Sequence, residues 1–158
     1  MARTTPATLA LTKAGVAFSL QTYDYDPNAP RIGLAAAEAM GVTPDIVLKT
    51  LMALVDGKPV CVVLPSDREV SMKALAAAVG AKAAAMMKPA DAERMTGYKI
   101  GGVSAFGQRK LVPTVFEQAA TAHAQVYMNG GGRGVQVLLD PKAAVAALQA
   151  TVAPICAA

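Results

Sequence analysis

A lysine lies inside an apolar, strand-like stretch of the chain. Lys49 stands in the run Val47–Met52, whose other members are apolar except Thr50. A lysine in a strand can extend its aliphatic stem along the sheet so that its charge reaches water. It can also bind an anion, because its compact charge and three N–H donors suit phosphate or carboxylate oxygens. Lys49 is therefore our first candidate for contact with an anionic ligand.

Glycines are concentrated between Tyr98 and Gly107, in the sequence Tyr-Lys-Ile-Gly-Gly-Val-Ser-Ala-Phe-Gly. Glycine permits positive φ and lets backbone N–H groups approach a ligand oxyanion closely. The alternative is an ordinary bend between two strands. Gly102 and Gly107 also have the spacing of a nucleotide-binding P-loop, but Gln108 and Arg109 follow where that motif requires Lys and Ser or Thr. We therefore reject nucleotide hydrolysis.

A second glycine-rich segment, Asn129–Gly134, holds one arginine between two strand-like runs. A flexible hairpin loop explains it as well as a ligand site does. In the functional interpretation, Asn129, the backbone of Gly131 and the guanidinium of Arg133 face a phosphate or a ribose, since the planar guanidinium suits phosphate oxygens.

The remaining polar residues form no recognisable catalytic or metal-binding arrangement. His123, the only histidine, has no Ser or Cys in a nucleophile motif. Cys61 lies among valines, which favours an inert buried thiol, and Asp24 and Asp26 are typical of a turn. We expect neither a metal nor a cofactor.

The segments that must position these residues alternate between helical and strand patterns. Helices with polar caps or glycine ends are predicted at about residues 5–14, 33–40, 72–79, 88–97 and 141–148, with a short turn at 43–45. Strands are predicted at 16–23, 47–55, 60–64, 125–128 and 134–139, and Asp56-Gly57 in the connection 56–59 predicts a hairpin. The pattern indicates one α/β domain over residues 1–158, without repeats or linkers.

Composition narrows the class of protein. The chain has 158 residues, of which 54% are hydrophobic but only 4% aromatic, so small residues should dominate the core. The net charge of +4 and the pI of 9.2 weakly favour a polyanionic partner. No apolar run reaches the roughly 18 residues of a membrane span, and no signal peptide is apparent. We expect a cytoplasmic protein that does not bind membranes.

Four segments, taken in order, resemble the YbaK family of aminoacyl-tRNA deacylases: Thr22–Pro27, Lys49–Leu51, Thr96–Ser104 and Gly131–Gly134. The similarity runs nearly from end to end. That family comprises free-standing relatives of the editing domain inserted in bacterial prolyl-tRNA synthetases. The resemblance implies a single α/β domain with a mixed, barrel-like β-sheet flanked by helices. It also implies removal of a mischarged amino acid from tRNA, first of all cysteine from Cys-tRNA(Pro).

The resemblance also assigns roles to individual residues. It places the family's required lysine at Lys49, and pocket positions at Tyr23, Thr50, Gly101, Gly102 and Ser104. We expect Lys49, Gly101 and Gly102 to act in catalysis, the glycines by holding the carbonyl oxygen with their N–H groups. The residues expected to bind substrate are Tyr23, Thr50, Ser104, Asn129, Gly131 and Arg133.

Three positions depart from the family pattern. Ala105 stands where many members have proline, Asn129 where serine is usual, and Gly132 where lysine often precedes the arginine. These departures keep open a deacylase for Ala- or Ser/Thr-charged tRNA, or a tRNA-binding accessory of a synthetase that lacks hydrolysis. The expected partners are aminoacyl-tRNA and, as a further candidate, prolyl-tRNA synthetase, but not DNA. The sequence does not indicate an oligomeric state.

Overall fold

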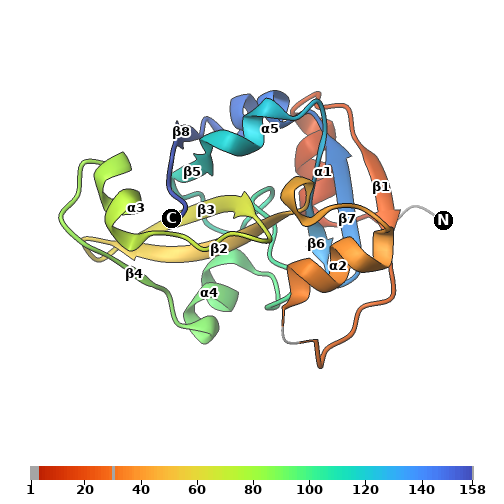
Figure 1. Ribbon diagram of the computed structural model, residues 1–158, viewed down its shortest axis with the longest axis horizontal. Helices are drawn as coiled ribbons and strands as arrows, with labels where there is room; N and C mark the ends of the chain where they lie inside the picture. The colour runs from red at the N-terminus through yellow and green to blue at the C-terminus, as the bar shows by residue number, and fades with distance from the viewer. Residues whose placement is uncertain (1–3, 30, 158) are drawn as a thin grey trace.

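Two β-sheets meet in the middle of the protein, with α-helices around them (Figure 1). The computed structural model describes residues 4–29 and 31–157. One sheet is antiparallel with the order β1-β7-β6, and the other is mixed with the order β4-β2-β3-β5-β8. The strands are β1 Ser19–Thr22, β2 Leu48–Val55, β3 Lys58–Pro65, β4 Ala84–Met86, β5 Thr114–Glu117, β6 Val126–Gly132, β7 Val135–Leu139 and β8 Thr151–Ala153.

The predicted helices are confirmed, and most of their ends coincide with capping residues. The α-helices are α1 Pro6–Lys13, α2 Ile32–Met40, α3 Met72–Ala78, α4 Pro89–Thr96 and α5 Pro141–Leu148, with 3₁₀ turns at Pro44–Ile46 and Gln118–Ala122. The side chains of Thr5, Ser71 and Asp140 accept backbone N–H groups at the starts of α1, α3 and α5. Gly41 and Gly97 end α2 and α4 in the left-handed conformation.

The β2–β3 hairpin is tighter than the predicted connection 56–59. Its turn consists of Asp56 and Gly57 alone, with φ values of 48° and 79°. A two-residue turn of this kind needs positive φ at both positions and matches the twist of the strands that it joins. Lys58 and Pro59 therefore belong to β3, where they pair with Val55 and Leu54.

Tertiary pairing creates strands that the sequence does not predict, namely β4, β5 and β8. Strand β4 consists of alanine and methionine, which have little intrinsic strand preference, and pairs with the end of β2. Strand β5 is buried along its whole length and therefore lacks the alternation of a half-exposed strand. Conversely, the strand predicted over residues 16–23 is limited to Ser19–Thr22.

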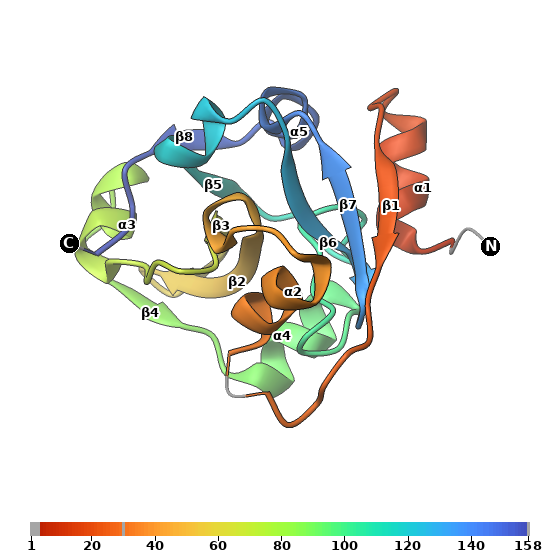
Figure 2. The ribbon, with the colours of Figure 1, turned by 45° about the vertical axis from the view of Figure 1, so that its right-hand side comes forward.

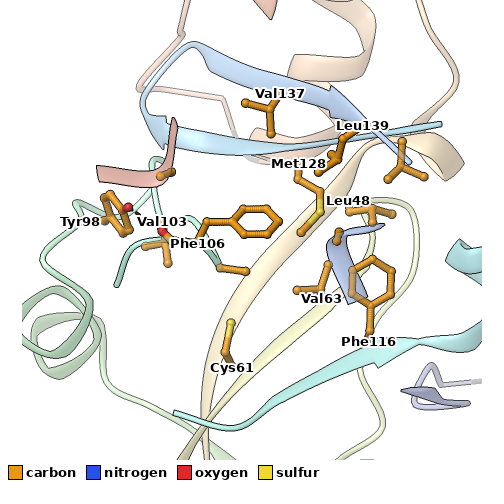
Figure 3. Packing of buried hydrophobic residues seen from close by; sticks show 14 of the residues in the cluster. Leu48, Cys61, Val63, Tyr98, Val103, Phe106, Phe116, Met128, Val137 and Leu139 are labelled. Carbon is orange, nitrogen blue, oxygen red and sulfur yellow. Dashed lines mark hydrogen bonds between the residues drawn. The ribbon is translucent and has the colours of Figure 1, made fainter. Parts of the chain in front are cut away.

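The core between the two sheets anchors the first glycine-rich segment (Figure 3). Tyr98 and Phe106, at either end of this segment, are buried, and the Tyr98 hydroxyl donates to the Phe106 carbonyl at 2.6 Å. Cys61 is 1% exposed in the same core, and burial raises its pKa to about 12, which confirms the expected buried thiol. The turn at Gly101 is thus held from both sides.

The two sheets are joined at one point and then separate. Val47, directly before β2, forms a parallel bridge with Tyr127 of β6. At the other edge of β2, β4 pairs only with Ala53, Leu54 and Val55. Residues 48–51 of β2 consequently have a backbone edge that β4 does not cover. None of the helices in the described segments is long and apolar enough to span a bilayer.

A buried carboxylate ties the C-terminal tail to β5. Glu117 is 4% exposed and accepts N–H groups from Ile155 at 2.9 Å, from Cys156 at 3.2 Å and from Ala119. Burial acts to raise the pKa of Glu117, but the N–H donors stabilise its charged form and hold the pKa below its ordinary value. The same tail is also bonded to the segment that follows β3: the Ser71 N–H donates to the Ile155 carbonyl, and the Ala157 N–H donates to the Glu69 carbonyl.

We predict that Glu117→Gln lowers the free energy of unfolding at neutral pH by about 1.5–3 kcal/mol, because backbone donors lose a charged acceptor. Since the folded-state pKa is depressed, this stabilisation is present above the unfolded-state pKa of about 4.3 and is lost as the pH falls through the folded value. Urea denaturation between about pH 7 and pH 3 should show the difference between the two proteins shrinking in the acidic range. A difference that is constant with pH would contradict this role.

Candidate functional site

A cavity of about 430 Å³ lies along the uncovered edge of β2. Residues of α2, of α4 and of the segment after α4 form part of its walls, and Figure 2 shows α2 and α4 beside β2. Its volume lies within the range of about 300–1,000 Å³ that is usual for small-ligand sites. The polar and charged residues that line it are Tyr23, Arg31, Lys49, Thr50, Ser66, Glu69, Asn129 and Gln136.

Lys49 lines this cavity. Its side chain is 21% exposed, and its ammonium lies 3.6 Å from the carboxylate of Glu69. The Glu69 side chain is 71% exposed, and such a surface pair contributes only up to about 1 kcal/mol. An anionic ligand can therefore compete with Glu69 for the ammonium.

Gly101 borders the cavity on another side, and its position in the chain accommodates only glycine. Its φ is +91°, and a Cβ atom there would collide with the Tyr25 hydroxyl. Within the described segments, no acceptor takes the Gly101 N–H. Gly101 thus has an unpartnered N–H among these segments and lines the cavity.

Gly102 differs from its expected role. Its N–H donates to the Lys99 carbonyl at 2.8 Å and closes the turn, so it is not available to an oxyanion. Gly102 is also buried outside the cavity lining, and a Cβ atom there would lie 2.9 Å from the Arg133 nitrogen. Its absence of a side chain permits close contact between the turn and β6.

Ser104, Gly131 and Arg133 also lie outside the cavity lining. Ser104 is fully buried, and its Oγ accepts the N–H of Phe106 at 3.1 Å. A Cβ atom on Gly131 would lie 3.0 Å from the Tyr98 ring. Both residues therefore act in packing, contrary to the expected substrate contacts, whereas Arg133 is exposed.

The second glycine-rich segment is mostly strand rather than the expected loop. Strand β6 continues through Gly132, with an irregularity between Asn129 and Gly132. The Asn129 side chain donates to the Gly101 carbonyl at 3.2 Å and accepts the N–H groups of Gly131 at 2.7 Å and Gly132 at 3.2 Å. Asn129 thus connects the two glycine-rich segments at the wall of the cavity.

Three buried polar atoms without a hydrogen bond belong to residues that line the cavity. Among the described residues, the buried side-chain atoms without a hydrogen bond are the Tyr23 hydroxyl, the Thr50 hydroxyl and the Gln136 amide oxygen, and all three residues line this cavity. An unsatisfied buried polar atom costs about 1–3 kcal/mol, so the arrangement favours a ligand that forms hydrogen bonds with these residues. Burial raises the pKa of Tyr23 despite the opposing effect of the nearby Gln136 side chain.

Sequence reasoning missed several lining residues. Gln136 is a polar residue between Val135 and Val137 in a predicted strand, and this interruption was a usable signal. Ser66 and Glu69 follow β3 in a segment without a distinctive pattern. They reach the cavity because Ser66 bonds to the Val47 carbonyl and the C-terminal tail holds the segment.

Comparison with known proteins identifies the family. The aminoacyl-tRNA editing domain family matches residues 26–146. A protein of Enterococcus faecalis named "Putative Cys-tRNA(Pro)/Cys-tRNA(Cys) deacylase EbsC" is 34% identical over 110 residues, which are 69% of this chain and 67% of that protein. The chain belongs to the aminoacyl-tRNA editing domain family, whose activity is the enzymatic deacylation of aminoacyl-tRNA.

Solved structures confirm the fold. A structure described as a "putative trans-editing enzyme for prolyl tRNA synthetase" matches with a TM-score of 0.82 and 20% identity, over 99% of this chain and all of that one. A "hypothetical protein APE2540" matches with a TM-score of 0.86 and 22% identity, over 97% of this chain and all of that one. The expected α/β fold of the YbaK kind is therefore confirmed.

We predict that Thr50→Val does not destabilise the protein and changes the free energy of unfolding by between zero and about +1 kcal/mol, because it removes an unsatisfied hydroxyl at nearly constant volume. The same variant should lower kcat/KM for deacylation. Thr96→Val is the matched control, since the buried Thr96 hydroxyl bonds to the Ala92 carbonyl and the Tyr98 N–H. Urea denaturation should show a loss of about 1–2 kcal/mol for the control, and an equal loss for both variants would argue against the role of Thr50.

Proposed function

We propose that this protein hydrolyses mischarged aminoacyl-tRNA, with Cys-tRNA(Pro) as its principal substrate. One observation carries the proposal: the same cavity is lined by Lys49, by Gly101 and by the three residues that hold unpartnered polar atoms. The name of the E. faecalis relative supports cysteine as the amino acid. Prolyl-tRNA synthetase is then the enzyme whose charging error supplies the substrate, since a proline pocket rejects a similar-sized side chain by only about 1–3 kcal/mol.

In the proposed complex, the 3′-terminal aminoacyl-adenosine enters the cavity. Lys49 exchanges the exposed Glu69 carboxylate for the terminal phosphate or the ribose hydroxyls. The N–H of Gly101 donates to the ester carbonyl oxygen, and Tyr23 forms a wall of the side-chain pocket.

The unpartnered atoms of the cavity suit the substrate's α-ammonium group. The hydroxyl oxygens of Tyr23 and Thr50 and the amide oxygen of Gln136 can each accept one N–H.

The chemistry that we propose needs little from the protein's side chains. The substrate's own thiol attacks its carbonyl carbon, the C–O bond to the ribose breaks, and the thiol proton passes to the ribose oxygen. The tRNA leaves with an intact terminus, and water then opens the cyclic thioester to give free cysteine. The protein contributes orientation and stabilisation of the developing oxyanion.

We predict that Lys49→Ala lowers kcat/KM for Cys-tRNA(Pro) by about tenfold to a hundredfold, since a hydrogen bond to a charged group contributes about 1.5–3 kcal/mol. Single-turnover deacylation of the purified mischarged tRNA measures this effect. Lys58→Ala is the matched control, because Lys58 is an exposed lysine at the far end of the same hairpin. Deacylation by Lys49→Ala at the parental rate, with Tm retained, would remove Lys49 from the mechanism.

We predict that Ser-tRNA(Pro) is cleaved far more slowly than Cys-tRNA(Pro), because a hydroxyl is a much weaker nucleophile than a thiol. The two charged tRNAs are compared at equal concentration with the unaltered enzyme. Equal rates would show that water, and not the substrate thiol, is the nucleophile. Faster cleavage of the seryl or alanyl ester would instead assign the enzyme to that amino acid.

A further inference from the structure

Three cationic residues lie in or beside the turn that borders the cavity, and the proposed ester chemistry does not use them. Arg133 donates its Nε to the carbonyl of Ile100, a lining residue, at 3.0 Å. Arg109 lies at the other end of the turn, where a Cβ atom placed on Gly97 would be 3.5 Å from its Nε. Lys99 lies between these positions in the chain. We call Lys99, Arg109 and Arg133 the cationic rim.

Few carboxylates of the protein neutralise the positive charge of the rim. All three side chains belong to exposed residues. Within the described segments, the cations that form salt bridges are Lys49, Arg94 and His123, and none of these is in the rim. The carboxylate bonded to this turn is that of Glu93, which accepts the Ile100 N–H at 2.9 Å. The rim therefore has a net attraction for anions.

Arg133 is held in an orientation that suits phosphate. Its guanidinium lies 5.3 Å from the centroid of the Tyr25 ring, and its Nε is bonded to Ile100. These two contacts leave the terminal nitrogens of the guanidinium available. An immobilised planar guanidinium binds two phosphate oxygens at little further entropic cost.

We propose that the cationic rim binds the backbone phosphates of the tRNA acceptor stem while the 3′ terminus occupies the cavity. The inference rests on the proposed function, because it names the part of the substrate that lies outside the cavity. Phosphate contacts fix the position of a nucleic acid without reading its sequence. The rim thus increases affinity for any acceptor stem, and selection of the amino acid takes place in the cavity.

The test compares two cysteinyl esters, one of an acceptor-stem minihelix and one of the trinucleotide CCA. The double variant Lys99→Gln/Arg109→Gln removes rim charge, and Lys58→Gln/Lys142→Gln removes two exposed charges elsewhere. We expect the rim variant to lower the ratio of kcat/KM for minihelix to trinucleotide by about tenfold. The plot of log kcat/KM against log salt for the minihelix should become shallower by about 1.8, or about 0.9 for each lost phosphate contact. The control variant should retain the wild-type ratio.

An unchanged ratio and salt slope in the rim variant would overturn this inference. Fluorescence anisotropy of a minihelix that carries no amino acid measures binding to the rim without ester cleavage. A roughly tenfold higher Kd for the rim variant supports the inference, and an unchanged Kd contradicts it. If the wild-type protein bound the minihelix but cleaved neither ester, this result would contradict the proposed function and not the inference about the rim.

Discussion

The site depends on incomplete pairing of one strand. Strand β4 covers β2 only from Ala53 onward, while the Val47–Tyr127 bridge fixes the other end of the strand to the second sheet. Alternating residues of an antiparallel strand direct their backbone groups to opposite edges, so part of the β2 backbone faces the cavity. The same short stretch carries Lys49 and Thr50. A rigid strand, rather than a loop, therefore holds the ammonium and one of the unpartnered hydroxyls.

Local patterns predicted much of the fold. The caps at Thr5, Ser71 and Asp140, and the glycines that end α2 and α4, determine the helices through interactions within a few residues. The Asp56-Gly57 turn does the same for the β2–β3 hairpin. Strands β4 and β8 exist because of pairing with distant segments, which short-range preference cannot reveal. The division into two sheets has the same origin.

The site was predictable where a residue type was unusual for its surroundings. Lys49 in an apolar strand and Gly101 in a glycine-rich turn do line the cavity. Gly102 and Ser104 share the same segment but use their polar groups to build it. Which glycine amide is used within the turn depends on hydrogen bonds that the sequence does not display. Gln136 reaches the cavity from β7, and only the packing of the two sheets brings it there.

A crystal structure with a non-hydrolysable substrate analogue would show whether Lys49 and Gly101 contact the bound aminoacyl-adenosine. In 3′-cysteinylamino-3′-deoxyadenosine, an amide replaces the labile ester. We predict that its carbonyl oxygen lies about 2.7–3.2 Å from the Gly101 nitrogen and that the Lys49 ammonium has left Glu69 for the nucleoside. The proposed roles of Lys49 and Gly101 would be wrong if the analogue bound outside this cavity, or bound in it while Lys49 stayed on Glu69 and Gly101 lay beyond hydrogen-bonding distance.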